Sequence, residues 1–305
     1  MTPPLLLHVG YHKTATTWMQ RLLFTPRHGY HQIADHAQVF RHIVQPHGLT
    51  FDPGNMQALI TERLAGLPPD TVPVISSEIL SGHPFHGGYD SDVYAERLHR
   101  IAPQARILIS IRSQLRILPS VYMQYLLRGG TMPWPMFFQG QQAIGYFGFA
   151  AAHFEYDRLV AKYQALFGAQ NVFLMTQESL GTDMDAAAAA LATFAGNTAF
   201  TGLVPEARKV HAASYPEYAA PVLRRINQVQ SSVLNPAPVL RLGQTPDGLY
   251  RAAGYVLRRG AFKAMLHSRK PVTDYVRANF TGQFTESNRR LAACTGHAVP
   301  LPGYD

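Results

Sequence analysis

Residues 5–18 read LLLHVGYHKTATTW and decide the fold, because an apolar run passes through one glycine into a lysine and a cluster of hydroxyl groups. The apolar run predicts a buried strand, and the periodic segment 19–24 that follows predicts a helix. The first turn of a helix has backbone N–H groups without partners and carries the positive end of the helix dipole. The stretch therefore predicts a cradle for a phosphate or sulfate group, with Lys13 as its mobile cation.

The ATP-binding loop is the obvious comparison, and the sequence does not fit it. That loop is Gly-x-x-x-x-Gly-Lys-Ser/Thr, whereas here only two residues separate Gly10 from Lys13, and His12 precedes the lysine. Nucleotide triphosphatases also place a magnesium-binding aspartate after an apolar strand. The two later candidate strands end at Glu78 and Arg112 instead. The usual nucleotide triphosphatase pattern therefore fails.

A second informative stretch runs over residues 106–125 and reads RILISIRSQLRILPSVYMQY. Its β-branched run ends at Arg112, and a segment with helical spacing follows, in which Ser120 lies eight positions beyond the arginine. The carboxyl ends of parallel strands border the crevice in which open α/β sheets bind ligands. We therefore expect Arg112 to project into that crevice and the helix to carry Ser120 back towards it.

Together the two stretches resemble the signatures of the sulfotransferases that use 3′-phosphoadenosine 5′-phosphosulfate (PAPS). The first family signature is a strand followed by Lys-Ser/Thr-Gly-Thr-Thr-Trp, which wraps the 5′-phosphosulfate, and residues 13–18 match it at five of six positions. The second is a strand that ends in arginine with a serine eight positions later, which binds the 3′-phosphate. Arg112 and Ser120 match it in residue type and spacing.

The resemblance implies a PAPS-dependent sulfotransferase of the bacterial type on a P-loop-like fold. It implies cofactor contacts from His12, Lys13, Thr14, Ala15, Thr16, Thr17, Trp18, Arg112 and Ser120. The tryptophan of this signature lies against the adenine in the family. A basic loop closes on the 3′-phosphate in many members at the place of residues 208–211, which adds Arg208 and Lys209. Ala15 replaces the family's glycine, which implies a slightly different loop path or one that is already helical.

These residues also have structural interpretations, which the sequence leaves open. The three threonines fit helix caps as well as anion ligands, and Trp18 fits a position in the core. Arg112 fits a salt bridge at a strand end. Ser120 follows Pro119 and fits the N-terminal cap of a helix.

Sulfuryl transfer needs a base, because the acceptor's hydroxyl or amine loses its proton as the bond to sulfur forms. Glu78 is the first candidate, since it closes the second apolar strand and belongs to the same crevice edge as Lys13. Some family members use a glutamate and others a histidine, so His83, His86 and His12 are candidates behind it. Lys13 is the candidate that stabilises negative charge on the departing nucleotide.

Alternation of strands and helices indicates the fold class. Candidate strands at 5–9, 72–76, 106–111 and 171–175 alternate with helical patterns. This order predicts a central parallel sheet with helices on both faces. No repeat and no flexible linker divides the 305 residues. We therefore expect one α/β domain, 1–305, with a helical C-terminal part from about residue 205.

The composition favours an acidic ligand. The formal charge of +8 suits an anionic nucleotide and an anionic glycan acceptor, and the scattered basic residues form no nucleic-acid motif. We therefore expect no nucleic-acid partner. Cys294 is the only cysteine, so an intrachain disulfide and a cysteine-based metal site are excluded. The pair His83 and His86 lacks a defined third ligand, so no metal is expected.

Apolar segments long enough for targeting or membrane insertion are missing from the sequence. The run at 5–9 is too short for a signal peptide and has no basic region before it. The alanine-rich stretch 186–192 is too short to span a bilayer. We therefore expect a soluble, cytoplasmic protein without a membrane span, and the oligomeric state stays open.

Two other functions and the nature of the acceptor also stay open. A kinase or other phosphotransferase on a related fold would depend on magnesium and prefer ATP. A non-catalytic module for anionic glycans would bind glycans without any nucleotide. The acceptor is a carbohydrate, a lipid or a small molecule, and the aromatic residues that fit either an acceptor pocket or the core are Tyr122, Tyr125, Trp134, Phe137, Phe138, Tyr146 and Phe147.

Overall fold

The computed structural model describes residues 3–140, 147–209, 215–296, 301 and 303–304. Within them a five-stranded sheet has the order β2-β3-β1-β4-β5, and every pair of neighbouring strands is parallel. The strands are Leu6–His8 (β1), Tyr30–Ala34 (β2), Val72–Ser76 (β3), Arg106–Ile111 (β4) and Val172–Thr176 (β5). The predicted parallel sheet is confirmed, with β2 as an edge strand that the sequence did not indicate.

Strand β1 lies at the centre of the sheet, between β3 and β4. Leu6 pairs with Val74 on one side and with Arg106 on the other. The chain moves from β1 to one edge of the sheet, returns through β3 and then crosses to β4. Such a change of direction opens a crevice at the carboxyl ends of the strands. The turn after β1 therefore lies at the place where ligands of this fold class bind.

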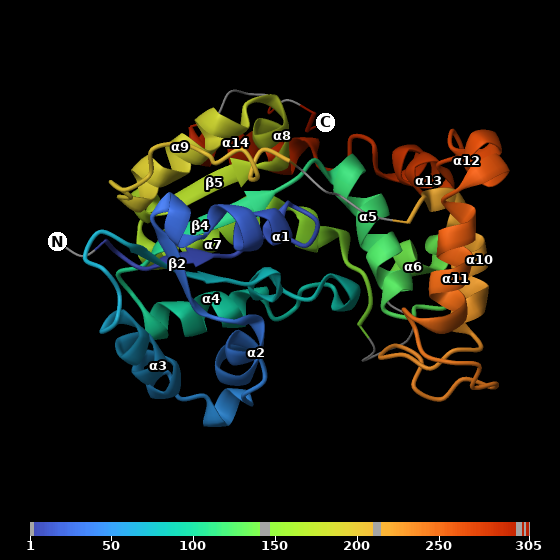
Figure 1. Ribbon diagram of the computed structural model, residues 1–305, viewed down its shortest axis with the longest axis horizontal. Helices are drawn as coiled ribbons and strands as arrows, with labels where there is room; N and C mark the ends of the chain where they lie inside the picture. The colour runs from blue at the N-terminus through green and yellow to red at the C-terminus, as the bar shows by residue number, and fades with distance from the viewer. Residues whose placement is uncertain (1–2, 141–146, 210–214, 297–300, 302, 305) are drawn as a thin grey trace.

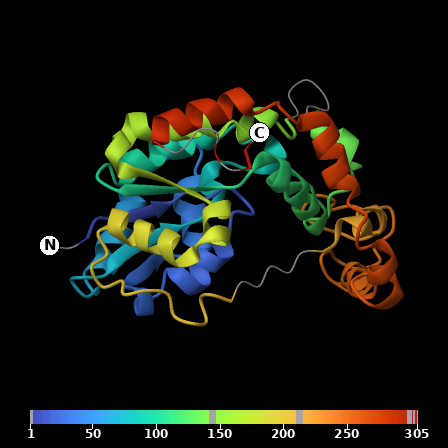
Figure 2. The ribbon, with the colours of Figure 1, turned by 90° about the horizontal axis from the view of Figure 1, so that it is seen from above.

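Helices cover both faces of the sheet (Figures 1 and 2). One face packs against α1 (Thr16–Trp18), the π-helix η1 (Met19–Leu23), α8 (Gln177–Thr182) and α9 (Met184–Ala195). The other packs against α3 (Gly54–Leu64), α4 (Ser91–Ile101), α5 (Gln114–Leu127) and α7 (Tyr156–Phe167). Helix α14 (Thr285–Thr295) packs on the outside of α7. Successive side chains of β1 point to opposite faces of the sheet. Leu6 packs in the hydrophobic core on the face of α1, and Leu7 packs in the core on the other face.

Short helical elements connect the strands to these helices. Before β3 they are η2 (Pro26–His28), α2 (His36–Val39), the π-helix η3 (Phe40–Val44) and η4 (Gly48–Thr50). After β3 they are η5 (Glu78–Ser81) and η6 (Pro84–His86). Between α5 and β5 they are α6 (Trp134–Gln139), η7 (Ala151–Phe154) and η8 (Ala169–Asn171).

The C-terminal part contains helices and irregular chain, as predicted. After α9 the chain is irregular, and η9 (Glu217–Ala219), α10 (Ala220–Asn227), α11 (Gly248–Leu257), α12 (Gly260–Leu266) and α13 (Pro271–Phe280) follow. Helices α10 and α13 pack against α5, so this part lies beside the sheet and forms the right-hand end of the molecule in Figure 1. Among the described residues no helix has the length and apolar character that crossing a membrane requires.

Candidate active site

The turn between β1 and α1 has an unusual backbone. Lys13 and Ala15 have φ angles of 71° and 67°, in the left-handed region that favours glycine. This conformation costs an L-residue about 1–2 kcal/mol. Ala15 is therefore not yet helical, and α1 begins at Thr16. The alanine adopts, at a cost, a conformation that a glycine would reach freely.

Gly10 lets this turn lie close to β4. The N–H of Tyr11 donates to the carbonyl oxygen of Ser110 over 2.9 Å. A Cβ on Gly10 would lie 2.4 Å from the hydroxyl oxygen of Ser110 and 2.7 Å from Nε2 of His8. Any side chain at residue 10 would collide with these two groups, which lie directly beneath the turn.

A chain of buried hydrogen bonds begins under the turn. Thr14 donates its hydroxyl proton to the carbonyl oxygen of Tyr11 over 2.6 Å. Its oxygen must therefore accept the proton of Ser110, 2.8 Å away. Ser110 in turn accepts from Nε2 of His8 over 2.9 Å, which leaves Nδ1 of His8 to accept from Ser76 over 2.7 Å. The geometry assigns the proton of His8 to Nε2.

This chain continues to the candidate base. The amide of Gln20 donates to the hydroxyl oxygen of Ser76 over 3.2 Å and also bonds to the carboxylate of Glu78. Burial lowers the pKa of His8 to about 4, although the charge of Glu78 opposes that shift, so the ring is neutral at pH 7. We call Gln20, Ser76, His8, Ser110 and Thr14 the relay. It connects the anion-binding turn to Glu78 across β4, β1 and β3.

Three cations converge above the relay. Burial lowers the pKa of Lys13, and the charges of Arg112 and Arg128 lower it further, while Glu78 opposes them. Lys13, Arg112 and Arg128 have no ion pair within the part of the chain that the structure describes. Arg128, which follows α5, was not among the predicted site residues. These three side chains therefore form a region of unneutralised positive charge, which we call the basin. A bound anion would stabilise it.

Arg112 and Ser120 come together as the spacing predicts. One guanidinium nitrogen of Arg112 donates to the hydroxyl oxygen of Ser120 over 3.2 Å, and its Nε is buried without a hydrogen-bond partner among the described residues. Ser120 lies in the middle of α5, which begins at Gln114, so its interpretation as an N-terminal cap is wrong. Arg112 forms no salt bridge with any residue that the structure describes, and its Nε is available to an acceptor.

Glu178 and Tyr304 border the Arg112 side of the basin. The carboxylate of Glu178 accepts the N–H of Ser113 over 3.2 Å and the phenol proton of Tyr304 over 3.1 Å. It also lies 3.7 Å from a guanidinium nitrogen of Arg116. The sequence did not indicate either residue, because both are far from Arg112 along the chain.

Glu78 and the candidate histidines gather on the other side of Lys13. Burial raises the pKa of Glu78, but a hydrogen bond from its own N–H, the nearby His12 and His36, and Gln20 outweigh it, so its pKa is lowered. The ring centroids of His12 and His83 lie 6.5 Å apart, and those of His83 and His86 lie 4.6 Å apart. The structure therefore brings all four candidate bases to one place.

Two of these histidines are neutral at pH 7. Burial lowers the pKa of His12 to about 4 against the opposing charge of Glu78, and His83, Lys13 and Arg128 lower it as well. Burial together with His86 and Arg128 lowers the pKa of His83 to about 4. Nε2 of His12 is buried, and no described residue forms a hydrogen bond with it. Each ring is therefore unprotonated at one nitrogen, and an anion that neutralised the cations would raise both pKa values.

The remaining predicted cofactor contacts lie around α1. Thr16 is buried and Thr17 is exposed. Trp18 is only 7% exposed, and its indole N–H donates to the carbonyl oxygen of Ala207 over 2.7 Å. This bond holds the segment before Arg208 and Lys209 against the turn. Arg208 itself forms two hydrogen bonds to the carboxylate of Asp185, of 2.8 and 3.0 Å. The roles assigned to these residues stay predictions.

Most of the predicted aromatic acceptor residues belong to the core. Tyr122, Tyr125, Phe137 and Phe138 are buried and in mutual contact. Trp134 is half-buried beside them. Tyr146 lies outside the described residues. Phe147 is exposed, and its ring centroid lies 4.4 Å from that of Tyr89.

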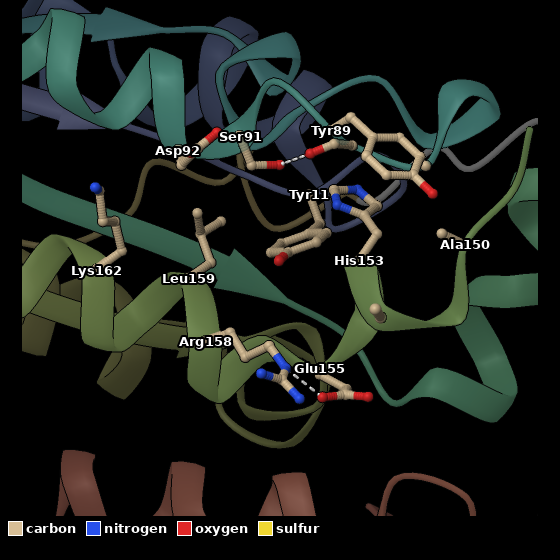
Figure 3. A pocket seen from close by; sticks show the side chains of 13 residues that line it. Tyr11, Tyr89, Ser91, Asp92, Ala150, His153, Glu155, Arg158, Leu159 and Lys162 are labelled. Carbon is tan, nitrogen blue, oxygen red and sulfur yellow. Dashed lines mark hydrogen bonds and ion pairs between the residues drawn. The ribbon is translucent and has the colours of Figure 1, made fainter. Parts of the chain in front are cut away.

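A cavity of about 400 Å³ lies between the first turns of α4 and α7 (Figure 3). Tyr11, from the anion-binding turn, and His153 form one side of it, and their ring centroids lie 4.9 Å apart. Burial lowers the pKa of His153 to about 3, assisted by His12 and His83. The other lining residues are Gly87, Gly88, Tyr89, Ser91, Asp92, Ala150, Ala152, Glu155, Arg158, Leu159 and Lys162. The cavity thus adjoins the candidate bases.

Comparisons with known proteins identify the fold. The chain matches no protein-family model and no curated protein. A sulfotransferase from Alicyclobacillus acidocaldarius aligns with 98% of this chain and 98% of its own, with a TM-score of 0.57 and 15% identity. A mouse sulfotransferase complexed with PAP covers 96% of this chain and 87% of its own, with a TM-score of 0.42 and 15% identity. Over nearly its whole length, the chain therefore has the P-loop-like α/β fold of the bacterial sulfotransferase.

Proposed function

We propose that the protein is a sulfotransferase that moves a sulfuryl group from PAPS to a hydroxyl or amine group. One observation carries this proposal. Lys13 and Arg112 lie at the carboxyl ends of adjacent strands, close enough for the charge of Arg112 to lower the pKa of Lys13, and no carboxylate pairs with either within the described residues. Two unneutralised cations on either side of one crevice suit a nucleotide with phosphate groups at both ends.

The phosphosulfate end and the terminal phosphate end of PAPS need different binding groups, and the site contains a suitable group for each end. A phosphosulfate suits the turn, which combines the backbone N–H groups that precede α1 with the cation of Lys13. A terminal phosphate suits Arg112, because a planar guanidinium binds phosphate oxygens in pairs. The buried Nε of Arg112 has no hydrogen-bond partner among the described residues, and its other nitrogen already donates to Ser120.

The reaction needs positioning and electrostatics more than covalent chemistry by the protein. The acceptor oxygen or nitrogen attacks sulfur while the bond from sulfur to the bridging oxygen of the nucleotide breaks. The acceptor's proton passes to Glu78 or to one of the neighbouring histidines. Lys13 stabilises the negative charge that grows on the bridging oxygen. The products are the sulfated acceptor and adenosine 3′,5′-bisphosphate.

We place the acceptor on the side of Glu78 and the cavity behind Tyr11. The cavity adjoins the segment after His86, and Tyr89 and Phe147 present exposed rings at its edge. Exposed rings of this kind stack on sugars or apolar groups. The proposal therefore covers carbohydrate, lipid and small-molecule acceptors.

Transfer of labelled sulfate from PAPS to a panel of acceptors tests the function. We expect transfer without ATP, and we expect adenosine 3′,5′-bisphosphate to raise the melting temperature more than ATP with magnesium does. For Glu78→Gln we expect the nucleotide to bind while turnover falls by about 100-fold or more. Stabilisation by magnesium ATP alone would favour a phosphotransferase and contradict the proposal.

A further inference from the structure

The net positive charge of the chain arises in one segment, because that segment contains almost no acidic residues. Residues 222–270, which we call the basic lobe, contain nine of the 27 Lys and Arg residues but only one of the 19 Asp and Glu residues. The rest of the chain contains 18 of each sign and is neutral, so the lobe carries the whole formal net charge of +8. A nucleotide site elsewhere in the molecule does not explain a charge placed here.

The same segment exposes many of the molecule's apolar side chains. Val233 and Val239 are 82% and 95% exposed. The other large apolar residues that the lobe exposes among the described side chains are Val222, Leu240, Leu242, Leu249, Tyr255, Val256 and Met265. Scattered apolar residues are normal on a surface, but a concentration of them marks an interaction site.

Helix α11 shows how charge and apolar surface combine. Tyr250 and Gly254 are buried on its inner side. Leu249 and Val256 share the opposite side because they are two turns apart, and both are exposed. The exposed Arg251 lies on another side of the helix, where it pairs with Asp247, and the exposed Arg259 follows the end of the helix at Leu257. The helix therefore presents apolar side chains to solvent with basic side chains near them, a combination that helices on membranes also have.

The basic lobe is fixed to the part of the molecule that carries the site. The amide of Asn227, at the end of α10, donates to the carbonyl oxygens of Leu126 and Gly130 over 2.8 and 2.9 Å. These residues flank Arg128 at the end of α5. In Figures 1 and 2 the lobe forms the end of the molecule away from the sheet. A surface that held the lobe would therefore also orient the crevice.

We propose that the basic lobe docks the protein onto an anionic lipid surface. Arginine and lysine attract acidic headgroups, and exposed aliphatic side chains enter the boundary with the acyl chains. A second copy of the lobe would be repelled by the same charge. A nucleic acid would match the charge but would offer no place for Val239 or Leu240. The inference does not depend on the proposed function, because the charge and the exposed apolar residues of the lobe lie outside the crevice at the sheet.

Co-sedimentation of the full chain with vesicles tests this inference. We expect binding to phosphatidylcholine vesicles that contain about a quarter phosphatidylglycerol and little binding to pure phosphatidylcholine. Arg241 and Lys263 are exposed, and Arg241→Gln with Lys263→Gln should weaken binding about 25-fold, since each charge contributes about fivefold. The matched control is Arg41→Gln with Arg63→Gln, which removes two exposed charges outside the lobe, on η3 and α3, and should change binding less than about twofold.

The apolar contribution separates a membrane from a simple polyanion. Val239→Ser with Leu240→Ser should weaken vesicle binding about tenfold, while Leu49→Ser, at a 91% exposed position outside the lobe, should leave it unchanged. Equal binding to neutral and anionic vesicles would overturn the inference. So would tight binding to duplex DNA together with unchanged vesicle binding by the Val239 and Leu240 variant. The melting temperature and the circular dichroism spectrum should be the same in every variant, which shows that each one is folded.

Discussion

The crevice at the sheet and the basic lobe are both positively charged, but they hold their charge differently. At the crevice Lys13 and Arg112 are partly buried above a relay of hydrogen bonds, and their positions are determined by strand ends. In the lobe most of the cations are exposed and interspersed with aliphatic side chains, although Arg224 and Arg258 are half-buried. Converging, partly buried charge suits one small anion in one geometry, whereas dispersed charge suits an extended anionic surface. Net charge alone does not distinguish these two uses.

Replacement of Lys13 in the crevice should lower turnover far more than replacement of an arginine in the basic lobe. For Lys13→Ala we expect turnover to fall by about 100–1000-fold, because the charge on the leaving oxygen loses its stabilising cation. Arg259→Ala in the basic lobe should leave turnover on a water-soluble acceptor unchanged. Initial rates with labelled PAPS measure both variants. Unaltered turnover in Lys13→Ala would remove this lysine from the mechanism.

The relay should affect the crevice and not the lobe. Ser110→Ala removes one hydrogen-bond partner from Thr14 and one from His8, so we expect adenosine 3′,5′-bisphosphate to bind about tenfold more weakly. Ser77→Ala is the matched control, because Ser77 is equally buried and bonds to His36 over 2.9 Å, outside the relay. Calorimetry measures both affinities, and a nitrogen-15 spectrum of the histidines should show His8 neutral with its proton on Nε2.

Equal losses of affinity in Ser110→Ala and Ser77→Ala would show that the relay has only a structural role. A spectrum that showed the proton of His8 on Nδ1 would contradict the proposed direction of the hydrogen bonds. Vesicle binding should be the same in both variants.

Nucleotide binding should take up protons, and vesicle binding should not. The pKa values of His12 and His83 are both lowered to about 4, by burial and in part by nearby cations. A bound anion neutralises those cations and raises both pKa values, so proton uptake should grow as the pH falls from 7 to 5. Calorimetry in buffers with different ionisation enthalpies measures the uptake. Proton release over this range would contradict the charge arrangement.

The smallest expected effect concerns the turn itself. Ala15→Gly should raise the free energy of unfolding by about 1 kcal/mol, because glycine reaches the left-handed conformation without the cost that alanine carries. Ala190→Gly, at an exposed position inside α9, should lower it by about 1 kcal/mol. Chemical denaturation measures the two changes. A loss of stability in Ala15→Gly would show that this conformation is not strained.

The sequence predicts the sheet well where strands are buried. Strands β1, β3, β4 and β5 are continuous apolar runs, and their positions agree closely with the predicted ranges. Strand β2 was not predicted, because it is an edge strand that pairs only with β3. Its residues His31 and Gln32 are polar and partly exposed to solvent, so they interrupt the apolar pattern. An edge strand with polar residues looks like a loop in sequence.

The site was predictable only where its residues are neighbours in sequence. Lys13 and the threonines follow one strand, and Arg112 and Ser120 are held in register by one helix. The relay was not predicted, because its members lie on or near three strands whose order in the sheet cannot be read from the sequence. One polar residue near the end of each apolar run, at His8, Ser76 and Ser110, was the available signal.

Arg128 was not predicted as a site residue for a similar reason. It lies beyond the fourteen residues of α5, far from Lys13 along the chain, and only the folded path of α5 brings its charge near the turn. Without the strand order and the helix length, nothing distinguishes it from other surface arginines.

Calorimetric titration with adenosine 3′,5′-bisphosphate tests the central claim most directly, that cations at two adjacent strand ends hold the two ends of one nucleotide. We expect the intact protein to bind one equivalent, Arg112→Ala to bind it about as weakly as the intact protein binds adenosine 5′-monophosphate, and this variant to show no preference between the two nucleotides. Absence of binding, or an affinity for adenosine 5′-monophosphate equal to that for the bisphosphate in the intact protein, would contradict the account.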